Sequence, residues 1–402
     1  MRWSNRATSS WLIESTLGKE GAKMAERKAI RLGSVVRTNV STYSEKEGWA
    51  FVNYLDTGNI TQDTISEIQR INVGTDKLPS RARRKVQIGN IIYSTVRPNQ
   101  LHYGFIKSQP DNFLVSTGFA VIDVNEKEAV PEYIYYFLTH RDVTERLQAI
   151  AEQSTSAYPS IKPSDIEDLT IDLPPIEEQR KIVGLLKMLD DKIKQNTEIN
   201  NNLEQQADTL YQAFFSPKSG TKGKIVTLDE FCSIFTGKKN ANASVNGGKY
   251  KFFTCAPDAL QIDSYIYDGN AIIVSGNGAY TGRTRFYSGK FDLYQRTYAC
   301  TLLDSINPDY IFPLYWFVKL ELSKKIMGGT RGSAIPYIVM NDLAKFEFVY
   351  NADTFSKYLP VFKSLTEAIQ SNEFEIENLA MTRDSLLPKL MSGELDVSDI
   401  DL

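Results

Sequence analysis

The sequence of 402 residues contains only two histidines and three cysteines. His102 and His140 are too few for a histidine-rich metal site or for a catalytic network built from several histidines. Cys232, Cys255 and Cys300 are odd in number and have no CxxC spacing, which predicts reduced thiols in a cytoplasmic protein. No apolar run approaches the roughly 18 residues that a transmembrane helix needs. These absences exclude several classes of metal, disulfide-rich and membrane protein.

Motifs for nucleotide chemistry are also missing. The sequence has neither a GxxxxGK[ST] phosphate-binding loop nor a GxGxxG turn between a strand and a helix, and it has no Asp-Pro-Pro-Tyr-like loop for attack on an adenine amine. The formal net charge of −3 gives no general attraction to nucleic acid, so any DNA binding must come from local basic patches. The composition is that of a globular protein, and the length favours two domains.

The chain repeats itself at an offset of 177 residues. The stretch TSAYPSIKPSDIEDLTIDLPP (155–175) matches GSAIPYIVMNDLAKFEFVYNA (332–352), and PEYIYYFL from Pro131 matches PDYIFPLY from Pro308. Each copy then runs into a long helical pattern. The sequence therefore predicts an α+β protein in which a globular unit and a long helix occur twice.

The two long helices carry a narrow apolar seam with steps of four and three residues, which is typical of a coiled coil. About 35 residues make a rod of roughly 50 Å. The linker after the first helix is too short to run back along such a rod, so the second helix packs on the first most simply in antiparallel direction, with one unit at each end. Alternatively, each helix could pack on its own unit. Asparagines near the centre would fix the register at a cost in stability, and Arg383 interrupts the second row. The seam residues are Leu186, Leu189, Ile193, Asn196, Leu203 and Leu210, then Phe362, Leu365, Ile369, Asn372, Ile376, Leu379 and Leu386.

Polar loops follow equivalent predicted strands in the two units. In each, a Gly-Asn turn leads into an apolar strand, and then comes RPNQLHYG in the first unit and GNGAYTGRTR in the second. Arginine reads guanine, and asparagine or glutamine reads adenine, whereas the run RARRK is a candidate phosphate clamp. The basic run could also be a solvated face, and the glycine-rich pieces could be plain hairpin turns. The candidate DNA-binding residues are Arg81, Arg83, Arg84, Lys85, Ser94, Thr95, Arg97, Asn99, Gln100, Tyr103, Asn277, Tyr280, Arg283 and Arg285.

From about residue 28 onward the chain resembles the specificity (S) subunits of type I restriction-modification systems. The motifs that carry the resemblance are LPPIEEQRKIVGLLKMLDDKI (173–193), GNIIYSTVRPNQLHYGFI, VSTGFAVI (115–122), SAYPSIKPSDIEDLTIDLPP and RDSLLPKLMSGEL (383–395). The second helix lacks the Pro-Pro-x-x-Glu-Gln entry of the first and begins instead with NADTFSKYLP. Tetrapeptide repeats, which lengthen the spacer in some members, are absent.

The resemblance implies two target-recognition domains, each reading one half of a bipartite, asymmetric site in double-stranded DNA. The two helices would set the unread gap and dock two modification (M) subunits, and restriction (R) subunits would join them. The S-adenosylmethionine would sit on the M subunits and the ATP and Mg on the R subunits, so this chain would hold no cofactor, no metal and no catalytic residue. The implied organisation is an unassigned segment 1–27, a first domain 28–173, a spacer helix 174–216, a linker 217–224, a second domain 225–352, a second spacer helix 353–394 and a tail 395–402.

Two other functions stay open on the sequence alone. The chain could be a non-catalytic coiled-coil scaffold that binds two protein partners without DNA. It could also be a self-sufficient methyltransferase, which would require S-adenosylmethionine binding by the isolated chain. The matching positions of the arginine-bearing loops favour DNA recognition over the scaffold, and we predict that the isolated chain does not bind S-adenosylmethionine.

Overall fold

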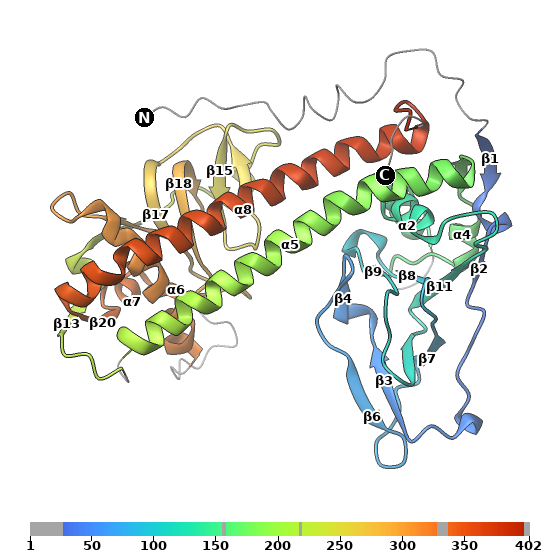
Figure 1. The fold of residues 1–402 in the computed structure, drawn as a ribbon, viewed down its shortest axis with the longest axis horizontal. Coiled ribbons are helices and arrows are strands. Elements are labelled where there is room, and N and C mark those ends of the chain that lie inside the picture. Colours follow the sequence, from blue (N-terminus) through green and yellow to red (C-terminus); the bar gives the residue numbers. More distant parts are fainter. Residues whose placement is uncertain (1–26, 155–157, 217–218, 328–336, 398–402) are drawn as a thin grey trace. The chain divides into compact units, whose positions relative to one another are not determined.

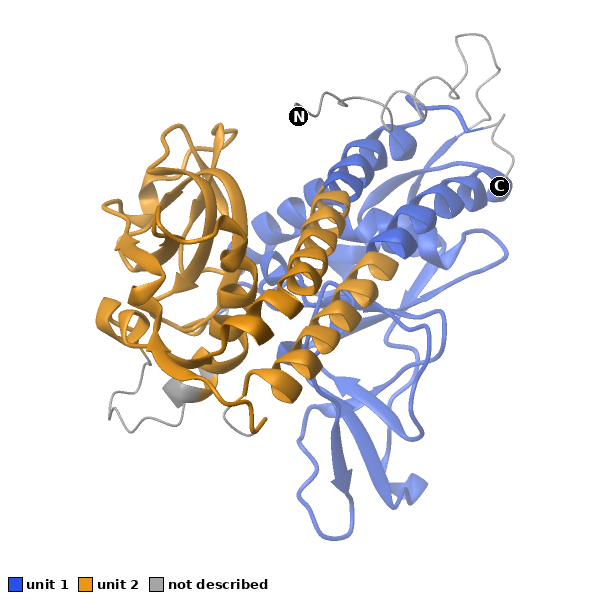
Figure 2. Cartoon of the chain, turned by 60° about the vertical axis from the view of Figure 1, so that its left-hand side comes forward, with its two compact units in different colours: residues 1–193, 378–402 blue, residues 194–377 orange. Residues whose placement is uncertain are grey.

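A computed structural model describes residues 27–154, 158–216, 219–327 and 337–397. The predicted N-terminal segment 1–27 therefore lies almost wholly outside the described residues, and the predicted tail 395–402 lies partly outside them. The chain divides into two compact units, one made of residues up to 193 together with those from 378, and the other of residues 194–377 (Figure 2). Each long helix contributes one part to each unit. Within the described residues no helix has both the length and the apolarity to cross a membrane.

The first unit is built from two four-stranded sheets, a closing pair of strands, a small two-stranded sheet and three short helices (Figure 1). The closing pair joins β1 (Lys28–Arg31) to β12 (Thr170–Leu173) in antiparallel register. One sheet has the order β2 (Val36–Thr38), β11 (Phe119–Val124), β8 (Ile91–Ser94), β9 (Tyr103–Phe105), and the other has β6 (Gln69–Asn72), β3 (Phe51–Leu55), β10 (Phe113–Ser116), β7 (Ala82–Lys85). The small sheet pairs β4 (Ile60–Thr61) with β5 (Thr64–Ile65), and the helices are α2 (Pro131–Thr139), α3 (Arg141–Glu152) and α4 (Pro163–Glu167).

The second unit carries a single six-stranded sheet with the order β14-β19-β17-β18-β15-β16. Its strands are β14 (Cys232–Thr236), β15 (Tyr250–Phe253), β16 (Leu260–Ile262), β17 (Tyr267–Ser275), β18 (Thr284–Leu293) and β19 (Thr297–Leu302). A closing pair again joins the first and last strands of the unit, β13 (Lys224–Thr227) and β20 (Glu347–Tyr350). The helices are α6 (Ile311–Met327) and α7 (Met340–Ala344).

The internal repeat predicted from the sequence is present in the fold. Strand order β2-β11-β8-β9 in the first unit corresponds to β14-β19-β17-β18 in the second. A short 3-10 turn follows the first strand of each closing pair, at Leu32–Ser34 and at Leu228–Glu230. The backbone nitrogen of Leu32 donates to the carbonyl of Leu169 (2.8 Å), and that of Leu228 donates to Phe346 (3.0 Å). The two units are therefore built on one scaffold.

The repeats differ where the second half of the sheet is made. In the first, β9 ends at Phe105 and β10 begins at Phe113, with an excursion between them. In the second, the single strand β18 pairs with β17 along its length and, at its end, with β15 in parallel, just as β10 pairs with β3. One continuous strand thus replaces a broken one.

This difference corrects the predicted Gly-Asn turn of the second unit. In the first unit the turn is real: Gly89 has φ +90°, and the Asn90 nitrogen donates to the Gln87 carbonyl (3.1 Å). In the second unit Gly269 lies inside β17, directly opposite Gly289 of β18. Both glycines have positive φ, at 147° and 132°, which only glycine adopts readily. A neighbouring strand is available there, so the chain pairs instead of turning.

The long helices α5 (Ile176–Phe214) and α8 (Ala352–Ser392) contact each other inside each unit. In the first unit the Arg383 Nη1 donates to Asp190 Oδ1 (2.8 Å). In the second, the Asn372 side chain donates to Asn200 (2.8 Å), and further along α5 the ring of Phe214 stacks on Tyr358, which lies earlier in α8, at 4.3 Å. Within the second unit the two segments therefore run antiparallel.

Most predicted seam residues are buried at these contacts. In the first unit Leu186, Leu189 and Leu386 belong to one apolar core, against which Leu379 packs. In the second unit Phe362, Leu365 and Ile369 share a core with Leu203 and Leu210 at its border. Asn196 is buried and donates to Glu375 (3.0 Å), so the polar seam position is hydrogen-bonded as burial requires. Ile193 and Ile376 are half-buried.

Candidate nucleic-acid interface

The first loop, residues 95–102, follows β8 and is fixed at both ends by hydrogen bonds. The backbone nitrogen of Arg97 donates to the Pro159 carbonyl (2.9 Å), and the nitrogen of Ile161 donates to the Thr95 carbonyl (2.8 Å). The Thr95 hydroxyl donates to the Gly118 carbonyl (2.9 Å). The side chain of Gln148 on α3 accepts from the backbone nitrogen of Asn99 (3.2 Å). Three neighbouring segments of the same unit thus hold this loop in one conformation.

The backbone of the first loop turns sharply and exposes polar side chains. Arg97 (φ +49°) and Leu101 (φ +58°) are left-handed and flank the 3-10 turn Pro98–Gln100. Pro98 is buried beneath the turn, whereas Arg97, Asn99 and Gln100 are exposed. Left-handed backbone is costly for residues other than glycine. Here it aims three side chains that can read bases outward together.

A cationic, aromatic depression lies beside this turn. It has a volume of about 250 Å³ and is lined by Arg81, Val96, Arg97, Gln100 and Tyr158. The Arg97 guanidinium lies 5.1 Å from the centre of the Tyr158 ring, and 60% of Tyr158 is exposed. Neither Arg81 nor Arg97 forms an ion pair with any residue in the described part of the chain. Tyr158 was not among the predicted site residues, although it stands in the repeated SAYPSIKP motif.

The other residues of the basic run are less available. β7 pairs with β10, so the run lies in a sheet and not on a free loop. Arg83 bonds to Glu45 (3.1 Å) and Lys85 bonds to Glu47. Burial lowers the pKa of Arg84, whose Nε is buried without a partner among the described residues. Arg81 is the exposed charge that the run contributes to the first loop.

Two predicted contact residues lie beneath the loop instead of on it. The Ser94 hydroxyl is buried and donates to the Val96 carbonyl (2.9 Å). Tyr103 is 6% exposed, and its ring stacks on Tyr93 at 5.8 Å. Burial raises the pKa of Tyr103. Tyr103 lies directly opposite Tyr93 across β8 and β9, and because both Ser94 and Tyr103 are buried we assign them a supporting role.

The second loop, residues 276–283, connects β17 to β18 and is held in the same way. The backbone nitrogen of Ile338 donates to the Gly276 carbonyl (2.8 Å), and that of Gly282 donates to the Ser275 carbonyl (2.9 Å). A Cβ on Gly276 would lie 2.4 Å from the carbonyl oxygen of Arg296, so only glycine fits there. The glycine-rich stretch is therefore a hairpin loop, as the alternative interpretation held, and it is also a presented surface.

An exposed arginine and tyrosine meet on the second loop as well. The Arg283 guanidinium lies 4.8 Å from the centre of the Tyr280 ring, and both side chains are exposed. Asn277 is half-buried beside them. Arg285 differs, because it bonds to the carbonyls of Ala256 and Pro257 (2.7 Å for the latter). Burial, and then Arg283, lower its pKa. Arg285 thus secures a neighbouring loop instead of pointing into solvent.

The two loops occupy equivalent positions on the scaffold. An isolated bridge joins Val96 to Ser160 in the first unit, and another joins Asn277 to Tyr337 in the second. Ser160 and Tyr337 are 177 residues apart, the offset of the sequence repeat. Each loop therefore leaves the same strand of the sheet and rests on the same repeated segment. An arginine of each loop lies over an exposed tyrosine, which belongs to the supporting segment in the first unit (Tyr158) and to the loop itself in the second (Tyr280).

The described residues of the two units show no cluster of metal-ligating side chains. In the described residues no three histidine, cysteine, aspartate or glutamate side chains gather as metal ligands. Cys232 and Cys300 are buried. Burial raises the pKa of Cys232 to about 12 and also raises the pKa of Cys300. Such thiols stay protonated and unreactive at neutral pH.

Comparison with known proteins gives one family. The chain matches the family described as "Type I restriction modification DNA specificity domain" over residues 29–205 and 222–350. It is 30% identical over 224 residues to the specificity subunit of the type I restriction enzyme HindI from Haemophilus influenzae, covering 56% of this chain and 48% of that protein. It is 23% identical over 427 aligned residues to the MjaIX specificity subunit from Methanocaldococcus jannaschii, covering 96% and 97%.

A solved structure has a similar fold. The S subunit of a type I restriction-modification system from M. genitalium aligns with a TM-score of 0.54 at 15% identity, covering 93% of this chain and 98% of that one. At this identity the likeness concerns the fold. Against the Haemophilus relative, the match spans about half of that protein's length.

Proposed function

The chain belongs to the type I restriction-modification DNA specificity family, and on that premise we propose that it is the sequence-recognising subunit of a type I restriction-modification complex. It reads a bipartite, asymmetric site in double-stranded DNA, one half with each repeat. The observation that carries this proposal is the pair of equivalent loops, each with an exposed arginine over a tyrosine. Arginine, asparagine and glutamine in such loops have the side chains that read base edges, which favours DNA recognition over the protein-binding scaffold.

The loops suit base reading because their backbones are fixed before DNA arrives. Arg97 and Arg283 carry guanidinium groups that can donate two hydrogen bonds to guanine, and Asn99 or Gln100 can do the same with adenine. A good bidentate contact discriminates by about 1–3 kcal/mol. Hydrogen bonds from neighbouring segments hold both loops, so little ordering entropy opposes binding. The loops differ in sequence, and therefore the two half-sites differ.

Contacts to phosphate play a smaller part. Arg81 is exposed beside the first loop, whereas Arg83 and Lys85 are occupied by Glu45 and Glu47. These ion pairs would have to open for the run to clamp a phosphate as predicted. With Arg83 and Lys85 occupied, few phosphates are neutralised beside the first loop, and a modest salt dependence is expected.

The helices α5 and α8 serve, in this proposal, as an antiparallel coiled coil that sets the unread gap. Support comes from the contacts inside each unit, at Asp190 with Arg383 and at Asn200 with Asn372. Arg383, which interrupts the seam, is tied into it: burial opposes its charge, but hydrogen bonds to Asp190 and Asp384 raise its pKa. Removing one partner of such a part-buried pair leaves an uncompensated charge.

The chemistry would lie on partner chains. We propose two M subunits with S-adenosylmethionine, R subunits with ATP and Mg, and a cytoplasmic complex in which this chain is non-catalytic. The entry of α5 carries LPPIEEQ and that of α8 carries NADTFSKYLP. The two docking surfaces for M subunits are therefore expected to differ in strength.

Titration of duplex DNA with the chain, alone and with its M subunit, tests the proposal at two salt concentrations. Specific binding that weakens with salt supports DNA recognition. Equal, salt-insensitive weak binding with and without the M subunit would instead favour a protein-binding scaffold. Binding of S-adenosylmethionine by the isolated chain would favour a self-sufficient methyltransferase.

A further inference from the structure

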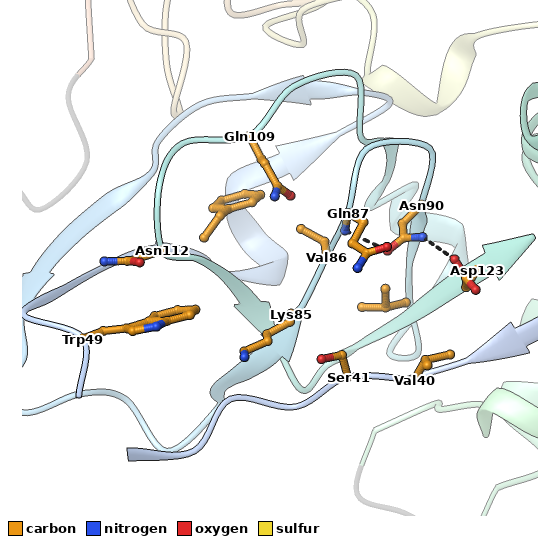
Figure 3. Close-up of a pocket in the computed structure, with 12 residues that line it drawn as sticks. Val40, Ser41, Trp49, Lys85, Val86, Gln87, Asn90, Gln109, Asn112 and Asp123 are labelled. Carbon is orange, nitrogen blue, oxygen red and sulfur yellow. Dashed lines mark hydrogen bonds between the residues drawn. The ribbon is translucent and has the colours of Figure 1, made fainter. Parts of the chain in front are cut away.

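A hollow of about 400 Å³ lies in the first unit, beside the break between β9 and β10. It is bordered by the turn around Gly89, by the end of the excursion at Gln109 and Asn112, and by the segment that carries Trp49 (Figure 3). In the second unit β18 passes through the corresponding part of the sheet without a break. The hollow is therefore a feature of the first repeat, and its volume is in the range of small-ligand sites.

The lining of the hollow combines an apolar floor with an aromatic wall. Val86, Phe113 and Val121 are buried at its base. Trp49 is half-buried, and its ring lies 4.6 Å from that of Tyr43. Such surfaces suit a flat, weakly solvated ligand.

Among the lining residues, the lysine is ion-paired and the aspartate is hydrogen-bonded to a neutral side chain. The Lys85 ammonium pairs with Glu47 and lies 5.1 Å from the centre of the Trp49 ring. Asp123 accepts a hydrogen bond from the Asn90 side chain (3.0 Å). A phosphate would find no unpaired cation among these lining residues. The hollow therefore favours a neutral ligand.

Several lining groups have hydrogen-bonding capacity left over. The side-chain carboxamides of Gln87 and Gln109 are exposed and bond to no other residue in the described part of the chain. Asn112 donates to the Phe51 carbonyl (3.0 Å), which leaves its own oxygen available. A carboxamide offers a donor and an acceptor side by side, which match the N7 and N6 positions of adenine.

We propose that this hollow binds one unpaired purine base of the adenine type, with the carboxamides of Gln87 and Gln109 on its edge and Trp49 beside its ring. A concave site of this size lies in the range of small-ligand sites and has room for a single base. The choice of a nucleobase rests on the proposed DNA-recognition function. The base could belong to an unpaired nucleotide of DNA or to a free nucleoside, since both present the same edge.

The test compares two DNA hairpins that differ at one position, measured by fluorescence anisotropy with the full chain. One hairpin carries a single bulged adenine, and the other carries an abasic site there. Adenosine is tested separately by saturation-transfer NMR. The variant Gln87→Leu/Gln109→Leu removes the edge contacts, and Gln153→Leu changes an exposed glutamine outside the hollow as a matched control. The side chains of Gln87 and Gln109 have no protein partner among the described residues, so the fold of the double variant should persist. Trp49→Ala, which loses packing on Tyr43, is a second and more disruptive variant.

The wild type and Gln153→Leu should prefer the bulged adenine over the abasic site by about tenfold, since two hydrogen bonds are at stake, and the double variant should lose this preference. An adenosine signal that the double variant abolishes also supports the site and, without a hairpin preference, identifies a free nucleoside as the ligand. The proposal is overturned if neither probe is recognised, or if recognition survives in the double variant. A fully paired hairpin in the same titrations reports general DNA binding. If the chain binds adenosine but does not bind this hairpin, only the proposed function is rejected, and the base site stands.

Discussion

The two repeats share a scaffold and differ in the strand that continues the sheet beyond the loop. Both have the closing strand pair, the following 3-10 turn, the same order of central strands and a loop resting on the same repeated segment. They differ in the strand that continues the sheet, which is whole in β18 and broken between β9 and β10. Constant parts hold the long helices and the loops in place. Under the proposed function, the parts that differ can change which bases are read without changing how the loops are held.

The largest effect is expected from exchanging a whole recognition unit. Replacement of residues 30–173 by the corresponding domain of a relative should change one half of the methylated motif and leave the other half intact, because each repeat carries its own loop. Sequencing of methylated sites in cells that express the chimera with its M subunit gives the readout. A chimera in which both halves change would show that the repeats do not read independently.

Changing the spacer should move the two halves apart without altering either. Four residues inserted after Asn200 add about 6 Å to α5 and rotate the remainder of the helix by roughly 40° beyond a whole turn. Because Asn200 bonds to Asn372, a matched insertion just before Asn372 should preserve the pairing. The gap should then grow by one or two base pairs, since DNA rises by about 3.4 Å per pair.

The insertion in α5 alone is the control for that experiment. Without its match, the seam must bulge or slip, and activity should fall. An unchanged gap with full activity in the double insertion would mean that another part of the molecule sets the separation.

Single arginines should have smaller and separable effects. Arg97→Ala should weaken binding to the cognate site by about 1–3 kcal/mol through one half-site only. Arg141→Ala, which removes an exposed arginine paired with Glu145, is the matched control and should bind normally. Competition assays with cognate and unrelated duplexes separate the cases: a loss of equal size on both would make Arg97 a phosphate contact.

The repeat and the long helices could be predicted from the sequence, whereas the local backbone conformation and the side-chain contacts near the two loops could not. A constant offset gives the repeat, and a three-four seam gives α5 and α8 almost to the residue. The Gly-Asn pair at Gly269 has the local pattern of a turn, because its strand partner at Gly289 lies twenty residues away and outside any local window. The burial of Tyr103 and the hydrogen bonds from Arg285 to backbone carbonyls likewise depend on residues that are distant in the sequence. Tyr158 gave little signal, because the repeat places an isoleucine, Ile335, at the equivalent position of the second copy.

The smallest effect should come from the glycines that mark the difference between the repeats. Gly269→Ala should destabilise the second unit by about 1–2 kcal/mol, because a positive φ is strained for alanine and the added Cβ would lie 3.2 Å from the Tyr267 ring. Gly89 also has a positive φ (+90°), but an added Cβ meets no atom within 4 Å at its turn, so Gly89→Ala carries the backbone strain without the contact and should cost less. Urea denaturation of the two variants measures the difference, and equal losses would argue against the strand register at Gly269.

The central claim is that equivalent loops in the two repeats read different halves of one site. The most direct measurement is the methylated motif in cells that express the chain with its M subunit, carrying either Arg97→Ala or Arg283→Ala. The account predicts that each variant relaxes the motif in one half only, that the two halves differ, and that the gap keeps its length. Relaxation of the same half by both variants, or a motif unchanged by either, would contradict it.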